Sequence, residues 1–239
     1  WAALAGNFGE AERMADALRL RLEVAGHSQV AQIPFMQTFV LRWMQGRLAE
    51  TRPMVTALLA QMPESLTWWV LGAWAEAGAG DVDGALSRLA DRSTADLVSV
   101  DAGYQWQTAV AGTAVCASTV GARRWSEVAH DLLAPYSGRN MVFGYVAYLG
   151  AVDHHLGTLA SVLGRHDEAV IRLEAALERH RVIAARPWVA LSAAWLANAL
   201  TERDRRGDAT RADTLLAEAT DLAAALGLHA LPPPHPKLR

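Results

Sequence analysis

Amphipathic segments with helical spacing of apolar residues recur along the chain, and each follows a glycine at a fixed distance. A small residue stands five positions after each glycine; the six pairs are Gly6/Ala11, Gly46/Thr51, Gly80/Ala85, Gly121/Ser126, Gly164/Ala169 and Gly207/Ala212. Successive glycines are 34 to 43 residues apart. This period is typical of helix-turn-helix solenoids, in which each unit buries its apolar face against its neighbours. The pattern therefore predicts an all-α solenoid of about six helix pairs.

Turn and helix-breaking residues set the boundaries of the pairs. Gly78–Asp81 separates two helices, and Pro135 ends one because proline cannot continue a helix. The predicted helices are Trp1–Ala5 and Glu10–Ala25, Ser28–Gln45 and Leu48–Gln61, Ser65–Ala77 and Val82–Ala90, Ala102–Val120 and Ser126–Ala134, Ala151–Leu163 and Asp167–Ala184, and Pro187–Glu202 and Thr210–Leu226. Since the chain starts inside a helix, we expect a fragment of a longer protein with an incomplete first repeat. Residues 1–230 form one repeat domain, and 231–239 a proline-rich linker or tail.

One segment does not fit the regular alternation of helices and short turns. Tyr136–Gly150 is longer and richer in glycine and aromatic residues than a plain turn between repeats. Solenoid insertions add backbone that stacking does not require, so this segment is the expected functional departure. We expect that Arg139 pairs with Asp153 or caps helix carbonyls and holds the loop in place. The alternative is an anion or partner contact by Arg139, supported by Tyr145 and Tyr148.

The fifth pair resembles the tetratricopeptide consensus. Gly157 is followed by Gly164, Ala169, Leu173 and Ala176 at the spacing of that motif. The resemblance implies a right-handed superhelix. We expect Gly164 and Ala169 to lie where two helices cross too closely for larger side chains.

A longer resemblance covers nearly the whole chain and is strongest from about Leu132 to Gly227. Its most specific segments are Leu133–Asn140, Gly150–Gly157, Leu163–Ala169 and Ala185–Trp188. They are similar to the C-terminal helical-repeat region of large bacterial signalling ATPases of the STAND type. In that family the ATPase is often coupled to a LuxR-type DNA-binding domain or to a class III nucleotide cyclase. The resemblance implies a cytoplasmic regulatory segment that controls a switch elsewhere in the polypeptide.

Composition narrows the function classes. Apolar residues make up 52% of the chain. The formal net charge is −3, and the basic residues form no stripe along the sequence. This charge distribution argues against nucleic-acid binding by this segment. No apolar stretch reaches the roughly 18 residues that a membrane span requires, and no signal peptide opens the chain. The single Cys116 lies in an apolar helical segment and is expected to be a small core residue in a reducing compartment.

Catalytic, cofactor and metal motifs are missing from the sequence. It has no phosphate-binding P-loop, no basic helix-turn-helix and no nucleophile elbow, and Gly78–Gly84 is expected to be an ordinary turn. His154, His155 and His166 lack the spacing of paired metal ligands on a helix. We therefore expect a non-enzyme without a cofactor or a metal, with the histidines solvated or satisfied in the core.

The concave wall of such a solenoid is formed by the first helices of the pairs. Counting back from the turn glycines selects a candidate groove for a partner or effector: Met36, Trp43, Met44, Trp74, His154 and Thr158. Exposed methionine and tryptophan together would suit an amphipathic partner helix. The alternative is that these residues are core, as we expect for Trp68 and Trp195.

These observations lead to a non-catalytic regulatory domain. It contacts a protein partner or the parent's own ATPase domain, without direct nucleic-acid or membrane binding. The alternative hypothesis is a sensor that holds a small-molecule effector in the groove or beside Tyr136–Gly150.

Overall fold

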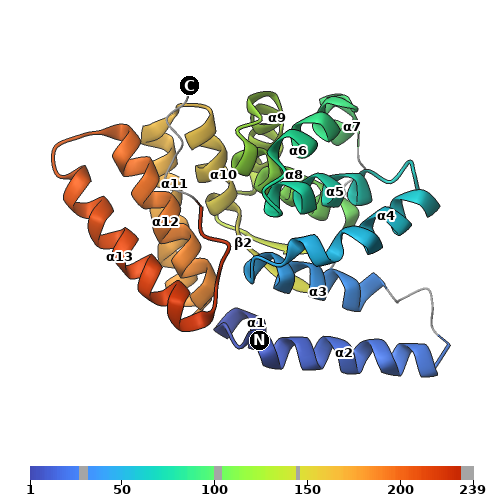
Figure 1. Ribbon diagram of the computed structural model, residues 1–239. Helices are drawn as coiled ribbons and strands as arrows, with labels where there is room; N and C mark the ends of the chain where they lie inside the picture. The colour runs from blue at the N-terminus through green and yellow to red at the C-terminus, as the bar shows by residue number, and fades with distance from the viewer. Residues whose placement is uncertain (27–31, 100–103, 144–145, 233–239) are drawn as a thin grey trace.

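The computed structural model describes residues 1–26, 32–99, 104–143 and 146–232, and it is mostly helical. The described helices are α1 (Ala2–Ala5), α2 (Phe8–Val24), α3 (Gln32–Met44), η2 (Leu48–Thr51), α4 (Arg52–Gln61), α5 (Leu66–Gly78), α6 (Val82–Ala90), α7 (Thr94–Val98), α8 (Tyr104–Val120), α9 (Arg123–Leu133), η3 (Ala134–Tyr136), α10 (Val152–Val162), α11 (His166–Val182), α12 (Arg186–Arg203) and α13 (Asp208–Leu226). A hairpin of β1 (Asn140–Phe143) and β2 (Ala147–Ala151) separates α9 from α10. The predicted helical class is confirmed, and the hairpin is an addition to it (Figure 1).

The periodic glycines share one backbone conformation. All six turn glycines have φ between 67° and 89°, in the left-handed region that a Cβ atom disfavours. Gly164 is one of them, and a Cβ added there would meet no atom within 4 Å. Our expectation that Gly164 lies at a close helix crossing is therefore wrong, since its backbone angle is what requires glycine. The close approach is at Gly157, where a Cβ would lie 2.5 Å from Leu173 Cγ.

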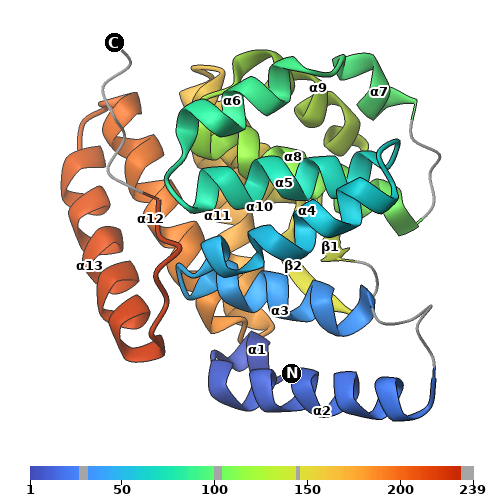
Figure 2. The ribbon, with the colours of Figure 1, turned by 45° about the vertical axis from the view of Figure 1, so that its right-hand side comes forward.

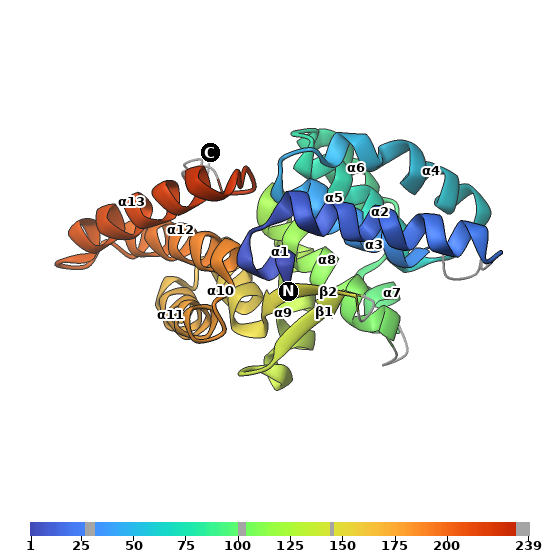
Figure 3. The same ribbon diagram turned by 90° about the horizontal axis from the view of Figure 1, so that it is seen from below.

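Polar contacts join residues that are about one period apart. Between α9 and the preceding pair, Trp125 Nε1 donates to the Leu89 carbonyl at 3.1 Å, 36 residues away. Between α11 and α13, the pairs are Arg181–Glu218 and Arg211–Glu174, each 37 residues apart. Successive pairs are therefore in contact, and in the last two pairs α12 packs against both α11 and α13 (Figures 2 and 3).

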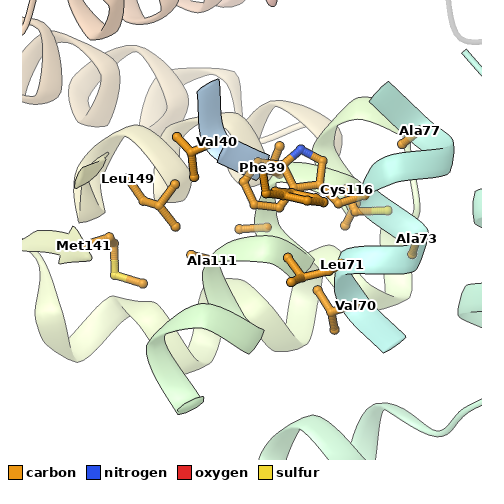
Figure 4. Close-up of a cluster of buried hydrophobic side chains, with 14 of the residues drawn as sticks. Phe39, Val40, Val70, Leu71, Ala73, Ala77, Ala111, Cys116, Met141 and Leu149 are labelled. Carbon is orange, nitrogen blue, oxygen red and sulfur yellow. The ribbon is translucent and has the colours of Figure 1, made fainter. Parts of the chain in front are cut away.

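The larger core cluster is rich in aromatic residues. Phe39 of α3, Leu71 of α5, Ala111 of α8 and Leu149 of β2 are fully buried in it, and Figure 4 shows them converging. A second cluster lies between α10 and α13 and consists mainly of alanine and leucine; its buried members are Ala160, Ala169, Val170, Leu173, Leu177, Val189, Ala193, Ala194, Leu196, Ala197, Ala199, Leu200, Ala212, Leu215 and Ala219.

The hairpin is part of the core rather than a loop on its surface. Its strands pair antiparallel with Val142 opposite Tyr148. Met141 and Leu149 are buried, and the strands contact α8 and α11. Gly150 has φ +85°, and a Cβ there would lie 2.5 Å from the Trp188 ring. The glycine thus allows Trp188 to pack directly on the hairpin backbone.

The segment after α13 returns to the first helix pairs (Figures 1 and 3). Leu228 is buried in the aromatic-rich cluster, and the His229 amide donates to the Met44 carbonyl at 2.7 Å. At the neighbouring turn, a Cβ on Gly6 would meet the Leu226 side chain. The last pair is therefore in contact with the first two. None of the described helices is long and apolar enough to cross a bilayer.

Candidate functional site

A groove of about 700 Å³ lies on the inner side of the helix pairs. Its walls come from α3, α5, α8, α10 and α12, and the segment His229–Pro232 borders it. The residues lining this groove are Trp43, Gly46, Trp74, Ala77, Gly78, Val82, Val115, Ser118, Thr119, Val120, Gly121, His154, His155, Thr158, Val162, Leu191, Trp195, Asn198, His229, Ala230, Leu231 and Pro232. This volume falls within the range of small-molecule sites.

The lining of the groove carries no aspartate, glutamate, lysine or arginine among the described residues. Several of its hydroxyl groups donate within their own helix: Ser118 and Thr119 to the Val115 carbonyl, and Thr158 to the His155 carbonyl. Their oxygen atoms therefore face the groove region mainly as acceptors. Trp43 and Trp74 form an edge-to-face pair with ring centroids 5.1 Å apart. The groove is thus aromatic at one end and neutral and polar at the other.

Four of the six groove residues selected from the sequence line this groove together: Trp43, Trp74, His154 and Thr158. Met36 and Met44 do not, since both are buried in the aromatic-rich cluster. The expected partner surface of exposed methionine is therefore wrong. The physical reason is that α1, α2 and the segment after α13 cover α3, which the offset from one glycine could not indicate.

Trp68 and Trp195, both expected in the core, differ from one another. Trp68 is buried, whereas Trp195 is half-buried and borders the groove. Cys116 is buried, and burial raises the pKa of its thiol to about 12. A thiol of that pKa is protonated at neutral pH and is a poor nucleophile.

Asp153 does not pair with Arg139, so the predicted Arg139–Asp153 ion pair is wrong. Its carboxylate accepts from Arg172 Nη1 at 3.0 Å, from Ser137 Oγ at 2.8 Å and from the Gly138 amide at 2.7 Å. Arg172 lies on α11, so no local spacing pointed to it. These bonds attach the start of the hairpin segment to the fifth pair.

The other candidate contacts of the hairpin segment take different positions. The Arg139 guanidinium lies over the Tyr136 ring, 5.9 Å from its centroid. Tyr145 lies outside the described residues. The Tyr148 ring packs edge-to-face against His180 and Trp188, and burial raises the pKa of its phenol. Tyr148 is therefore a packing residue of the hairpin.

A buried group of histidines surrounds Trp188 beside the groove. His154 Nδ1 and His180 Nδ1 each lie 2.9 Å from Ser192 Oγ, so that one hydroxyl bridges two imidazoles. The Ala151 amide donates to His180 Nε2 at 2.9 Å. We call His154, His180, Ser192 and the Ala151 amide the histidine network.

His155 lies next to this network, with its Nε2 2.6 Å from the Leu149 carbonyl. The Trp188 ring centroid is 5.2 Å from that of His154 and 5.7 Å from that of His180. The aromatic ring thus fixes the orientation of both imidazoles.

The imidazoles in this region are neutral at physiological pH. Burial lowers the pKa of His155 to about 4 and that of His180 to about 3. Burial also lowers the pKa of His154 well below its usual value, with the neighbouring His155 and His180 adding to the effect. Removing a cation from water is costly, which favours the uncharged form.

His180 and Ser192 were not selected from the sequence. Ser192 follows His154 by 38 residues, whereas the turn glycines of these two pairs are 43 apart, so counting one period forward from His154 does not reach Ser192. His166 lies apart from this site, at the first position of α11. Within the described ranges, no three His, Cys, Asp or Glu side chains are grouped to hold a metal ion.

A smaller pocket of about 390 Å³ lies between α1, α2, α3 and β2. Its lining is mainly aliphatic, with Met14, Val40 and Tyr148 among its residues. It offers few groups that could orient a ligand, so the groove is the stronger candidate site.

Comparison with protein-family models, curated protein sequences and solved structures gave no match in any of the three. The resemblance to the repeat region of signalling ATPases therefore stays a prediction.

Proposed function

We propose that the chain is a tetratricopeptide-like right-handed superhelix of about six helix pairs and that it is a non-catalytic regulatory domain which binds a small, neutral effector in its groove. It belongs, on this proposal, to a cytoplasmic bacterial signalling ATPase or transcriptional regulator. The effector changes the arrangement of the helix pairs, and that change reaches the ATPase or output domain of the parent.

The solenoid part of the proposal is supported by the turn glycines and by contacts one period apart. The six glycines share a positive φ at corresponding turns. Bonds such as Arg181–Glu218 and His154–Ser192 join corresponding helices at separations of 37 and 38 residues. Stacked repeats contact their neighbours in this way.

The size and neutrality of the groove carry the choice of effector. The groove has a volume of about 700 Å³. A drug-sized molecule fits that volume. Because Met36 and Met44 are buried, the groove also lacks the methionines that would contact the apolar face of a partner helix.

The position of the groove suggests how binding is coupled to regulation. One molecule in it touches first helices of five successive pairs and the segment after α13. A ligand that contacts several stacked units changes their equilibrium arrangement by its differential affinity for the two arrangements. The output therefore depends on the spacing of the pairs and needs no catalytic residue here.

Contact with a protein partner or with the parent's own ATPase domain is a second candidate function. It is favoured by the apolar side chains of Met14, Leu20 and Val24, which are exposed on α2. Such a surface suits an interdomain contact and is compatible with effector binding in the groove.

A thermal-shift screen tests the effector hypothesis. Sugars, nucleotides, peptides and neutral aromatic compounds are each added to the purified chain. A compound present at 100 times its dissociation constant should stabilise the fold by about 2.7 kcal/mol. We expect no ATP hydrolysis or nucleotide cyclisation, measured in the same preparations.

A pair of matched variants locates the binding site. Thr119 is exposed at the groove, and Thr214 is exposed on α13; each hydroxyl donates to the carbonyl four residues earlier. Thr119→Trp should fill the groove and abolish the shift, whereas Thr214→Trp should leave it unchanged. Stabilisation that survives Thr119→Trp would place the effector elsewhere.

A further inference from the structure

We propose that the groove selects an uncharged ligand with a carbonyl-type acceptor, which receives a hydrogen bond from Nε2–H of His154. This inference rests on the proposed function, because it concerns the same groove. The histidine network is what fixes the proton on that nitrogen.

The backbone amide of Ala151 can only donate, and this sets which atom donates in the hydrogen bonds of the histidine network. The Ala151 amide always carries its hydrogen, so His180 Nε2 must accept and the His180 proton must be on Nδ1. His180 Nδ1 then donates to Ser192 Oγ at 2.9 Å. One lone pair of Ser192 Oγ is then occupied, and we assign the Ser192 hydroxyl hydrogen to His154 Nδ1, also at 2.9 Å. His154 is left with its proton on Nε2.

The Nε2 atom belongs to His154, a residue that is only 4% exposed and that lines the groove. Within the part of the chain that the structure describes, Nε2 has no hydrogen-bond partner from the protein. Nε2 keeps some exposed surface, so an acceptor in the groove can reach it and form a hydrogen bond. Trp188 holds the ring in place, edge-to-face at 88°, so the donor is oriented before the ligand arrives.

The charge of the ligand follows from the lining. Since the described lining holds no carboxylate, ammonium or guanidinium group, a buried ionic ligand would lose its hydration without gaining a counter-charge. A neutral imidazole likewise offers a hydrogen bond but no charge. Trp43, Trp74 and Trp195 add aromatic surface for a planar group. The ligand class is therefore a neutral aromatic amide or lactam.

Two probes of nearly equal shape test the ligand class. N-acetyl-L-tryptophanamide is neutral, and N-acetyl-L-tryptophan carries a carboxylate. Calorimetric titration should show tighter binding of the amide by at least about 10-fold, and His154→Phe should weaken amide binding by about 10-fold. Equal binding of both probes, or amide binding that His154→Phe leaves unchanged, would overturn the inference. Failure of the amide to bind at millimolar concentration would overturn the ligand class.

Nitrogen-15 NMR of the histidine rings tests the network without any substitution. His180 should be the Nδ1–H tautomer, and His154 should be the Nε2–H tautomer. In Ser192→Ala the His154 tautomers should mix, and amide affinity should fall. The opposite tautomer at His154 in the unsubstituted chain would refute the network, whatever binds in the groove.

The two proposals fail in different ways. If a charged compound binds and Thr119→Trp abolishes that binding, effector binding stands and the neutral-ligand inference fails. If Thr119→Trp has no effect on any bound compound, the groove itself is not the effector site and both fail.

Discussion

The two core clusters are both closely packed, but one is filled by large side chains and the other by small ones. Around α3, α5 and α8 the core is filled by large rings such as Phe39, Trp74 and Trp188. Between α10 and α13 it is filled by alanines such as Ala169 and Ala212, with leucines between them. In the second cluster small side chains let helices approach closely, as the contact of Gly157 with Leu173 illustrates.

The groove lies at the border between these clusters. Trp43 and Trp74 line it from the aromatic-rich side, and Trp195 and Asn198 line it from α12. Rigid rings cannot fill the space beside a closely packed alanine layer completely, and a cavity remains where the packing changes. The comparison suggests that the change in side-chain size, rather than a dedicated insertion, creates the candidate site.

The largest expected effect concerns pH and the histidines at this border. Their pKa values are lowered in the folded chain, so below pH 6.5 the unfolded chain binds protons that the folded chain does not. Stability is therefore full above pH 6.5 and falls as the pH drops toward about 4 for His155 and about 3 for His180. Each pH unit costs roughly 1.4 kcal/mol per histidine. Urea unfolding at pH 7.5 and pH 5 measures the difference.

The matched control for this pH effect is His155→Gln. The variant should show a smaller loss between pH 7.5 and pH 5, by roughly 2 kcal/mol, because one titrating imidazole is gone. An unchanged pH dependence would mean that His155 is solvated and protonates in the folded chain.

Removal of a ring should damage the aromatic-rich cluster severely. Trp74 is fully buried and packs against Phe39 and Trp43. Trp74→Ala should lower the free energy of unfolding by about 3–5 kcal/mol through a cavity. Trp74→Phe keeps most of the volume and should cost less. A loss below about 1 kcal/mol for Trp74→Ala would show that the cluster collapses around the gap.

Added bulk should damage the alanine-rich cluster. Ala169 is fully buried at the crossing of α10 and α11, and Ala169→Leu should cost about 1–3 kcal/mol by overpacking. Ala175 is exposed on the same helix, so Ala175→Leu is the control and should be nearly neutral. If both variants melted at the temperature of the unsubstituted chain, the assigned crossing would be wrong.

The smallest effect is expected on the outer surface. Arg181 and Glu218 join α11 to α13 at 2.8 Å, with side chains 44% and 39% exposed. Arg181→Ala should cost less than about 1 kcal/mol, because water competes for exposed ions. The melting temperature should become less sensitive to salt than in the unsubstituted chain. A larger loss would indicate that such pairs hold the repeats together.

Local signals in the sequence sufficed for most helices. The glycine period and the turn Gly78–Asp81 placed α6 at Val82–Ala90, as predicted, and the structure shows Asp81 as its cap. Helix α7 was missed although Ser93 and Asp96 form a capping box, because its five residues are too short for a periodic pattern. The hairpin was missed because its pairing needs α8 and α11 as cover, which are distant in the sequence.

The candidate site was less accessible to sequence reasoning. His154 and Thr158 followed from their offset to Gly164, since that offset is local. The prediction that Met36 and Met44 line the groove was wrong, because segments from both ends of the chain cover α3. Arg172, His180 and Ser192 come from other helices, and only the stacking distance brings them to Asp153 and His154.

The return of the segment after α13 has a consequence for local opening. Terminal units of an open solenoid fray first, because each has one neighbour only. Here Leu228 is buried among residues of the early pairs, and the His229 amide is bonded to the Met44 carbonyl. Undocking of the last segment exposes both ends of the array at once. Amide hydrogen exchange in α3 and α13 should therefore rise together, as one cooperative unit.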